Sequence, residues 1–299
     1  MLSVLIPVYN FDVVALVKEL DQQCEQAEIS YEILCFDDRS EARFHLTHQS
    51  AFASMSQVTY RQLPENVGRS RIRNQLAVAA RFDYLLFMDC DSGVVSDRYI
   101  QNYLDYLEPN TLLYGGRVYA AFPPENQQLY FHWYYGRQRE QIGPDQRQQQ
   151  PYHSFMTNNF LIPRKVFLEI GFDESLREYG HEDTLFGMEL ANRQVPIRHL
   201  DNPLEHLGLE DQAVFLRKTS QAIVNLYQIS QRHLQLSTRL LDAFKKLKKW
   251  GGAPFICWFL NQLQPFLLRG LQPPRPRLLY FDLYKLSLLL NQDRHSKES

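Results

Sequence analysis

Short apolar runs that are each followed directly by polar residues constrain the fold of this chain more than any other feature. The run Leu2–Val8 is nearly continuous and rich in β-branched residues. Such runs are typical of strands buried on both faces of a sheet. The predicted strands are 2–8, 31–36, 58–62 and 84–88, and the predicted helices between them are 12–27, a stretch between 40 and 58, and 69–81. This alternation predicts an α/β fold with a mostly parallel, doubly wound sheet.

The chain beyond residue 88 is less regular. Its predicted elements are a strand over 110–120, helices at 164–170 and 182–192, and a long helix over 212–249. Residues 123–152 are rich in Gln, Arg and Pro with aromatic residues between them, which predicts a long mobile loop or acceptor lid. We place the domain boundary so that residues 1–211 form the α/β domain and residues 212–299 form a basic, mainly helical extension.

The formal net charge of −2 conceals a strong asymmetry. Residues 1–212 hold 18 Lys and Arg against 30 Asp and Glu, whereas residues 213–299 hold 14 against 4. A basic tail of this kind is expected to meet something anionic. The lysines of 244–250 precede aromatic and aliphatic residues at 255–263, which suits an anionic bilayer surface. Packing on the acidic body or on another subunit of a homo-oligomer is the alternative, and nucleic acid is not expected.

Composition and cysteine usage indicate a globular protein of a reducing compartment. Apolar residues make up 44% and charged residues 22% of the chain. The four cysteines have no metal-ligand spacing, which predicts buried free thiols. The start of the chain lacks the basic and small-residue features of a signal peptide, and no clean apolar stretch reaches about 18 residues. We therefore expect a cytoplasmic protein, held peripherally at the inner face of the cytoplasmic membrane if the tail binds lipid.

Acidic residues follow two of the predicted strands. Ligands of open α/β sheets bind outside the carboxyl ends of the strands. Asp89 and Asp91 point to the same side of extended backbone, and two hard oxygen ligands suit Mg²⁺ or Mn²⁺ held together with substrate phosphates. Asp37 and Asp38 can accept a hydrogen bond from a nucleobase imide. The alternatives are solvated strand ends for the first pair and turn or helix-cap chemistry for the second.

A basic segment lies at the start of one predicted helix. Gly68 allows a tight turn there, and Arg71 and Arg73 follow it. Amides of a helix N-terminus and guanidinium groups together bind anions. An exposed basic helix face is the alternative.

A second acidic pair and a histidine complete the candidate residues. Glu182 and Asp183 lie in the first turn of a predicted helix after Gly180. Such acids either complement the helix dipole or, when they face a cleft, act as a general base. His206 is a candidate metal ligand or a structural histidine.

In this order and spacing, these motifs resemble those of the family 2 glycosyltransferases, which are inverting nucleotide-sugar enzymes with a GT-A fold. The resemblance covers about residues 1–210 and leaves the tail outside. The matching residues are Pro7-Val8-Tyr9-Asn10, Asp37-Asp38 with Ser40, Asn66 with Gly68 and Arg73-Asn74, Asp89 with Asp91, Asn158-Asn159 before Leu161-Ile162-Pro163-Arg164, Gly171-Phe172-Asp173-Glu174, Gly180 with Glu182-Asp183, and His206.

The resemblance implies roles for the individual residues. Pro7, Val8 and Tyr9 would line the nucleobase pocket, Asp38 or Asp37 would hold the uracil edge, and Arg73, helped by Arg71, would lie at the nucleotide. Asp89 would contact the ribose or metal-bound water. Asp91 would ligate Mn²⁺ or Mg²⁺ directly, and His206 would be the second protein ligand. Asp183 would be the general base. Because Thr184 stands where relatives often carry a further acid, Glu182 is the alternative base.

The resemblance therefore implies transfer of a sugar from a nucleotide sugar, a UDP-sugar, to a hydroxyl of a glycan or lipid-linked acceptor, in bacterial surface-polysaccharide synthesis. The residues suit this chemistry, because a carboxylate can take the proton of the attacking hydroxyl while a cation and Arg offset the charge on the leaving diphosphate. A degenerate module that binds a nucleotide sugar or a partner enzyme without turnover is the alternative. A nucleotidyltransferase is disfavoured, since Tyr9–Asp12 is no Gly-rich loop.

Overall fold

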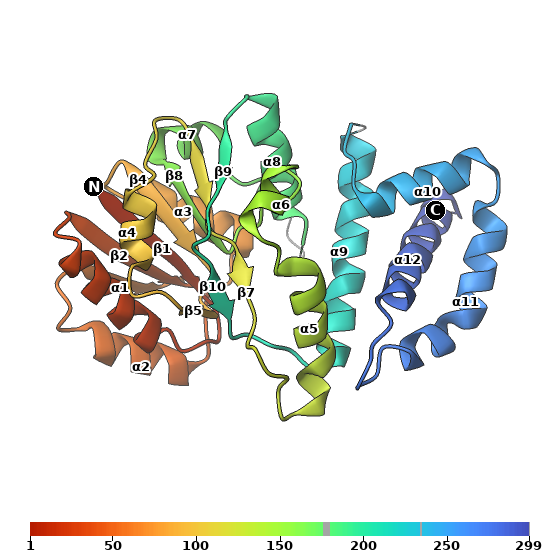
Figure 1. The fold of residues 1–299 in the computed structure, drawn as a ribbon, viewed down its shortest axis with the longest axis horizontal. Helices are drawn as coiled ribbons and strands as arrows, with labels where there is room; N and C mark the ends of the chain where they lie inside the picture. Colours follow the sequence, from red (N-terminus) through yellow and green to blue (C-terminus); the bar gives the residue numbers. More distant parts are fainter. Residues whose placement is uncertain (176–179, 234, 299) are drawn as a thin grey trace. The chain divides into compact units, whose positions relative to one another are not determined.

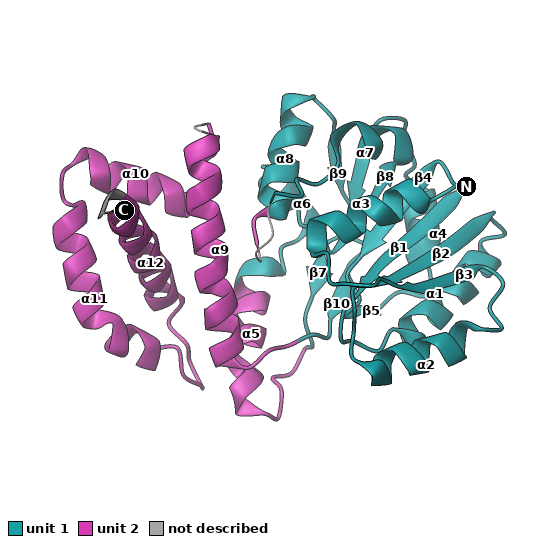
Figure 2. Cartoon of the chain, turned by 180° about the vertical axis from the view of Figure 1, so that it is seen from behind, with its two compact units in different colours: residues 1–120, 139–177, 182–208 teal, residues 121–138, 178–181, 209–299 magenta. Residues whose placement is uncertain are grey.

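The computed structural model describes residues 1–175, 180–233 and 235–298 (Figure 1). The described residues divide into two compact units (Figure 2). Unit 1 comprises residues 1–120, 139–177 and 182–208, and unit 2 comprises residues 121–138, 178–181 and 209–299. Unit 2 thus combines a segment from the middle of the chain with the C-terminal helices.

Unit 1 is built around a sheet to which the described residues contribute seven strands. In spatial order they are β3 (Val58–Gln62), β2 (Tyr31–Asp37), β1 (Leu2–Val8), β4 (Tyr84–Met88), β8 (Asn159–Pro163), β6 (Leu112–Tyr114) and β9 (Ile197–His199). Strands β1 to β4 are parallel, whereas β8 runs antiparallel to its neighbours β4 and β6. The predicted mostly parallel sheet is confirmed, and so are the strands at 2–8, 58–62 and 84–88.

Helices cover both faces of this sheet, which explains why the strands are apolar throughout. In β1, Leu2, Val4, Ile6 and Val8 pack into one hydrophobic cluster and Leu5 into the other. The helices of unit 1 are α1 (Val14–Gln26), α2 (Ala42–Phe52), α3 (Arg69–Ala79), α4 (Tyr99–Leu104), α6 (Pro144–Gln148), α7 (Arg164–Ile170) and α8 (Glu182–Asn192). Residues of α1 and α4 belong to the first cluster and residues of α3, α7 and α8 to the second. The predicted helices at 164–170 and 182–192 are confirmed.

A second, smaller sheet lies beside the carboxyl end of β4. It consists of β5 (Ser92–Val94), β10 (Leu204–His206) and β7 (Arg117–Val118). The prediction of a single strand over 110–120 is therefore wrong, because β6 and β7 belong to different sheets. The chain changes direction at Gly115 and Gly116, and Gly116 has a φ of 95°. A Cβ atom on Gly115 would lie 2.3 Å from the carbonyl oxygen of Asn202, so this tight passage requires glycine.

The prediction of a mobile loop over 123–152 is also wrong. The segment contains the 3₁₀ helix η1 (Gln127–Leu129), α5 (Tyr130–Tyr135), the π-helix η2 (Gly136–Glu140) and α6. Within unit 2, Phe131 is buried against Phe215 and Phe281. Within unit 1, the buried Arg147 donates hydrogen bonds to the carbonyl oxygens of Gly115 and Leu200. These contacts arise from tertiary packing, so they leave no periodic pattern in the sequence.

Unit 2 is helical. Besides η1 and α5, it contains α9 (Gln212–Arg232), α10 (Arg239–Lys249), α11 (Ala253–Arg269) and α12 (Leu278–Glu298). The predicted single helix over 212–249 is wrong, because α10 starts afresh at Thr238, whose hydroxyl caps the N–H of Leu241. None of the helices among the described residues has the length and apolar composition needed to cross a bilayer.

The cysteines agree with the sequence prediction. All four lie within the described residues and are free thiols, and Cys24, Cys35 and Cys257 are buried. Burial raises the pKa of the Cys24 thiol to about 12, so this group stays protonated at neutral pH.

Candidate active site

The residues after β1, β2 and β4 lie at one edge of the central sheet, as predicted, because these strands are parallel and neighbouring. Val8 at the end of β1 is paired with Asp37 at the end of β2, and the N–H of Asp38 donates to the carbonyl oxygen of Val8. Val8 is fully buried, whereas the side chain of Tyr9 is 53% exposed. This edge therefore offers an accessible aromatic ring beside two buried carboxylates.

Both carboxylates at the end of β2 are engaged by the chain itself. Asp37 accepts hydrogen bonds from the N–H of Ser40 (2.6 Å) and from the hydroxyl of Tyr60 (2.6 Å). Asp38 accepts the backbone N–H groups of Val67 (2.6 Å) and Gly68 (3.0 Å). Burial raises the pKa of Asp38 even though these two amides oppose the shift. Asp38 thus fixes the loop that leads into α3, where Gly68 has a φ of 84°.

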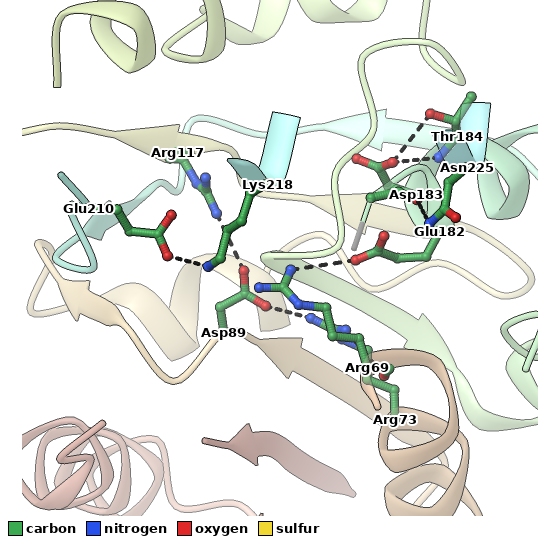
Figure 3. Close-up of polar contacts among 11 residues, drawn as sticks. Arg69, Arg73, Asp89, Arg117, Glu182, Asp183, Thr184, Glu210, Lys218 and Asn225 are labelled. Atoms are coloured by element: carbon green, nitrogen blue, oxygen red, sulfur yellow. Dashed lines mark hydrogen bonds and ion pairs between the residues drawn. The ribbon is translucent and has the colours of Figure 1, made fainter. Parts of the chain in front are cut away.

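Asp89 is held between two arginines (Figure 3). Its Oδ1 accepts from Arg73 of α3 at 2.6 Å, and its Oδ2 accepts from Arg117 of β7 at 3.3 Å. Arg117 also donates to Glu140 at 3.2 Å, and Tyr119 donates to the same carboxylate. Burial alone would lower the pKa of Arg117, but the surrounding anionic groups raise it well above its usual value. Arg117 is therefore a permanent cation shared by two carboxylates.

Replacing Arg117 is expected to destabilise unit 1. Arg117→Met leaves the largely buried Asp89 and Glu140 without their shared cation, which should lower the free energy of unfolding by about 3 kcal/mol. The matched control is Arg98→Met, which removes an exposed pair with Asp105 and should change stability by less than about 0.5 kcal/mol. Urea denaturation gives the free energy of unfolding of both variants and of the wild type. Equal stability of Arg117→Met and the wild type would contradict this account.

Asp91 and His206 come together through the smaller sheet. Strand β10 runs antiparallel to β5, and His206 is paired with Ser92, the residue after Asp91. The N–H of Leu207 donates to the backbone carbonyl of Asp91 at 2.8 Å. The Nδ1 atom of His206 lies 3.6 Å from Oδ1 of Asp91. Two residues that are 115 positions apart in the sequence therefore face each other, as the prediction requires.

The donor set of Asp91 and His206 fits a divalent cation. Oδ1 of Asp91 is buried and has no hydrogen-bond partner among the described residues, although it lies beside an imidazole. Burial tends to raise the pKa of Asp91, but His206, Arg117 and Arg69 outweigh it and hold this pKa well below its usual range. In the described part of the chain, no cluster of three or more His, Cys, Asp or Glu side chains forms a closed metal site. The pair thus suits an open site whose remaining ligands come from substrate and water.

The second acidic pair begins α8. Asp183 accepts the N–H of Thr184 at 2.7 Å and its hydroxyl at 3.3 Å, and both bonds go to Oδ1. Burial and the neighbouring charge of Glu182 raise the pKa of Asp183 to about 6. The carboxylate of Glu182 instead lies 3.5 Å from the guanidinium of Arg69 (Figure 3). Asp183 therefore has the basicity expected of a proton acceptor at neutral pH.

Charged residues link the two acidic pairs. The charge of Arg69 acts on Asp91, and the same guanidinium pairs with Glu182. The charge of Glu140 acts on Asp183, and Glu140 is joined through Arg117 to Asp89. The strand-end acids and the first turn of α8 therefore belong to one site of unit 1.

Two predicted nucleotide-binding arginines have different surroundings. Arg73 is buried and forms an ion pair with Asp89. Arg71 is exposed and lies 3.9 Å from Glu174, away from the acids just described. Pro7 lies within β1 and is partly exposed. These roles stay predictions.

Several matching motifs hold the scaffold. The amide of Asn74 donates to the carbonyl oxygen of Phe172 and to Glu174, and its oxygen accepts the N–H of Phe172. The buried Asn159 accepts the hydroxyls of Tyr99 and Tyr103. Asn159 also donates to the carbonyl oxygens of Gly116 and Asn202, which fixes the turn before β7.

Sequence reasoning missed Arg69, Arg117, Glu140 and Gly208. Arg69 directly follows Gly68, so the argument that selected Arg71 and Arg73 applies to it equally. Gly208 follows His206 by two residues, and a Cβ atom there would lie 2.2 Å from Oδ2 of Asp91. Arg117 lies in β7 of the smaller sheet and Glu140 in η2, and the sequence pattern predicts neither this sheet nor this helix.

Comparison with known proteins identifies the family. The family model described as glycosyl transferase family 2 matches residues 3–171, which is more than half of the chain. A search of curated protein sequences gives no match.

Solved structures share the fold. The mannosyltransferase PcManGT from Pyrobaculum calidifontis, in complex with GDP-Man and Mn²⁺, has a TM-score of 0.59 at 13% identity, covering 98% of this chain and 86% of that chain. S. aureus TarS 1-349 in complex with UDP has a TM-score of 0.51 at 15% identity, covering 99% and 91%. Glucosyl-3-phosphoglycerate synthase from Mycobacterium tuberculosis, in complex with Mn²⁺, UDP and glucosyl-3-phosphoglycerate, has a TM-score of 0.50 at 12% identity, covering 76% and 79%. These likenesses establish the GT-A fold. The chain belongs to glycosyl transferase family 2 and is a glycosyltransferase.

Proposed function

We propose that the protein transfers a sugar from a UDP-sugar to a hydroxyl group of a glycan or lipid-linked acceptor, with inversion at the anomeric carbon. The observation that carries this proposal is the single site formed by Asp91 and His206 on one side and Asp183 on the other, linked by Arg69 and Glu140. An open cation site beside a carboxylate of raised pKa is what sugar transfer from a nucleoside diphosphate needs.

The nucleotide half of the site is assigned to the edge after β1, β2 and β4. Tyr9 offers an exposed ring on which a nucleobase can stack, and Asp37 and Asp38 shape the adjoining loops. Of the three structures compared above, two hold UDP and one holds GDP-Man. The uracil preference comes from the family resemblance, and it is the part of the proposal that a binding experiment decides first.

The acceptor half of the site is assigned to Asp183. Its raised pKa lets it accept the proton of the acceptor hydroxyl as the oxygen attacks the anomeric carbon. The bond to the leaving diphosphate breaks as the new bond forms, so attack from the opposite side inverts the configuration. Glu182, which lies beside Arg69, is the alternative base. The cellular role proposed with this reaction is bacterial surface-polysaccharide synthesis.

Asp91 and His206 would hold the divalent cation. When bound, that cation offsets the negative charge on the leaving diphosphate. An imidazole in the donor set favours Mn²⁺ over Mg²⁺, because Mg²⁺ prefers oxygen ligands. Three further features surround this pair: Asp89 two residues before Asp91, Arg73 paired with Asp89, and the close backbone at Gly208.

Calorimetric titration with UDP, GDP and dTDP, each with and without Mn²⁺, tests the proposal. We expect UDP to bind in a Mn²⁺-dependent way and the other two nucleotides to bind more weakly. Tighter binding of GDP would overturn the donor assignment while leaving the metal site in place. No binding of any nucleotide by the folded protein would favour the degenerate binding module.

Gly208→Ala is expected to weaken cation binding. The new methyl group would lie 2.2 Å from Oδ2 of Asp91, so the carboxylate must shift from its position. We expect the affinity for Mn²⁺ in the presence of UDP to fall at least about tenfold, as when the support of a metal ligand is lost. The matched control is Gly93→Ala in β5, where the nearest atom, in Leu207, is 3.4 Å away. Equal Mn²⁺ affinity of Gly208→Ala and Gly93→Ala would show that the backbone at 208 does not position Asp91.

A further inference from the structure

Helix α11 has two faces of different character. Cys257, Leu260 and Leu267 are buried, and the helix packs against α12 within unit 2. On the other face, Phe255, Trp258, Phe259 and Phe266 are 65%, 58%, 44% and 56% exposed. At 100° per residue, these four side chains fall within one narrow sector of the helix, together with Gln262 and Arg269. We call Phe255, Trp258, Phe259 and Phe266 the aromatic stripe.

The aromatic stripe is unusual for a surface in water. Single exposed apolar residues are common, but four large rings along one helix face mark an interaction surface. Phenylalanine and tryptophan on one face of a helix are typical of helices that lie in the boundary between lipid headgroups and acyl chains. The rings also contact each other, with 6.1 Å between the centroids of Phe255 and Trp258.

Basic residues lie at both ends of the stripe. Lys246 and Lys249 precede α11 at the end of α10, together with the exposed Trp250. Arg269, Arg275 and Arg277 follow at the other end. Residues 239–277 contain eight Lys and Arg and a single acid, Asp242. Within the described part of the chain, no acidic side chain lies at salt-bridge distance from Lys246, Lys249, Arg269 or Arg275.

Arginine side chains line a cavity at the C-terminal end of the stripe. This cavity of about 620 Å³ is lined by Phe266, Tyr280 and the three arginines just named, together with the Pro273-Pro274 segment. Arg277 donates to the hydroxyl of Tyr280 at 2.7 Å, and both residues line the cavity. Guanidinium groups bind phosphate oxygens through paired hydrogen bonds.

We propose that the aromatic stripe and the basic residues at its two ends bind the surface of an anionic lipid bilayer. The helix lies on the membrane instead of crossing it, since its 17 residues include Pro265 and it fails the length and composition of a spanning helix, as do the other helices of the described residues. The rings enter the headgroup boundary and the basic groups meet lipid phosphates. A second copy of the chain would instead bring two strongly positive surfaces together, which is unfavourable. The proposal needs no nucleotide, so it stands apart from the proposed reaction.

Vesicle flotation with the full chain tests the proposal, using vesicles of phosphatidylcholine alone and of phosphatidylcholine mixed with phosphatidylglycerol. We expect flotation with the anionic vesicles, loss at high salt, and little flotation with phosphatidylcholine. Lys246→Gln/Lys249→Gln/Arg275→Gln should lower the partition coefficient by about 100-fold, since each basic group contributes roughly a fivefold factor near the surface. Tryptophan emission should shift to shorter wavelength on binding, and Trp258→Phe should reduce that shift.

A matched pair of variants separates the stripe from general surface hydrophobicity. Phe255→Ser/Trp258→Ser/Phe259→Ser should lose flotation, at least about tenfold. Leu46→Ser/Val78→Ser/Phe122→Ser removes three side chains elsewhere that are 63%, 67% and 83% exposed, and this variant should float as the wild type does. Circular dichroism checks that both variants are folded. The proposal fails if the wild type does not float, if the stripe variant floats like its control, or if the stripe instead holds a lipid-free dimer that this variant dissociates.

Discussion

Asp91→Asn is expected to abolish Mn²⁺-dependent binding of UDP and to lower kcat/KM about 1,000-fold. The amide keeps the size of the side chain but removes the negative charge that Oδ1 places beside His206. A bound cation would stabilise the charge on the leaving diphosphate by several kcal/mol, and this stabilisation is lost when the cation no longer binds. His206→Ala should act in the same direction, because it removes the second ligand.

Asp97→Asn is the matched control for this change. Asp97 lies six residues further along the chain and is exposed, so the same substitution removes the same charge without touching the pair. We expect its UDP binding and kcat/KM to stay within a factor of about two, as for most surface changes. The two variants are compared by calorimetry with UDP and Mn²⁺ and by release of UDP during turnover. Mn²⁺-dependent UDP binding by Asp91→Asn at wild-type affinity would remove Asp91 from the cation site.

Asp183→Asn is expected to lower kcat about 1,000-fold while leaving the affinity for UDP nearly unchanged. An amide cannot take up the proton of the acceptor hydroxyl, and loss of a general base costs about that factor. In the wild type, kcat/KM should fall tenfold per pH unit below about 6, because Asp183 must be ionised to act and burial raises its pKa to that value. The residual activity of Asp183→Asn should lack this acid limb.

Two variants of the same helix complete the experiment. Glu182→Gln should keep the acid limb. We expect it to lower the affinity for UDP moderately, about tenfold, because it breaks the contact with Arg69. Glu189→Gln, further along α8, should behave as the wild type does. Loss of the acid limb in Glu182→Gln with its retention in Asp183→Asn would exchange the two assignments.

The central sheet could be predicted from the sequence because its cause is local. Strands buried on both faces need apolar residues at every position, and Leu2–Val8 and Tyr84–Met88 carry that signature within themselves. The predicted strand over 110–120 failed because its break depends on Asn202, which crowds Gly115 from far along the chain. Residues 123–152 look polar in sequence, yet Phe131 and Arg147 gain their burial from partners more than 50 residues away.

The site could be predicted in part for the same reason. Asp89 and Asp91 follow a strand directly, so their position at the sheet edge could be inferred from local pattern. Their proximity to His206 followed from the family resemblance, and the pairing of β10 with β5 explains it. Arg117 and Glu140 lie outside every motif. Arg117, in the smaller sheet, pairs with Asp89, and Glu140, in η2, pairs with Arg117. A charge network of this kind is a property of the folded chain.

The hydrogen bonds that the carboxylates at the end of β2 accept bear on how homologous sequences should be sorted. Asp37 and Asp38 use their oxygens to hold Ser40, Tyr60, Val67 and Gly68 in place, so a chain that had lost its activity would still need both to fold. A survey of genomes that used these two residues as its criterion would therefore include both active and inactive homologues. Asp91, His206 and Asp183 contribute less to holding the fold, so selection would no longer conserve them once catalytic activity was lost. These three positions should therefore distinguish catalytically active homologues from inactive ones.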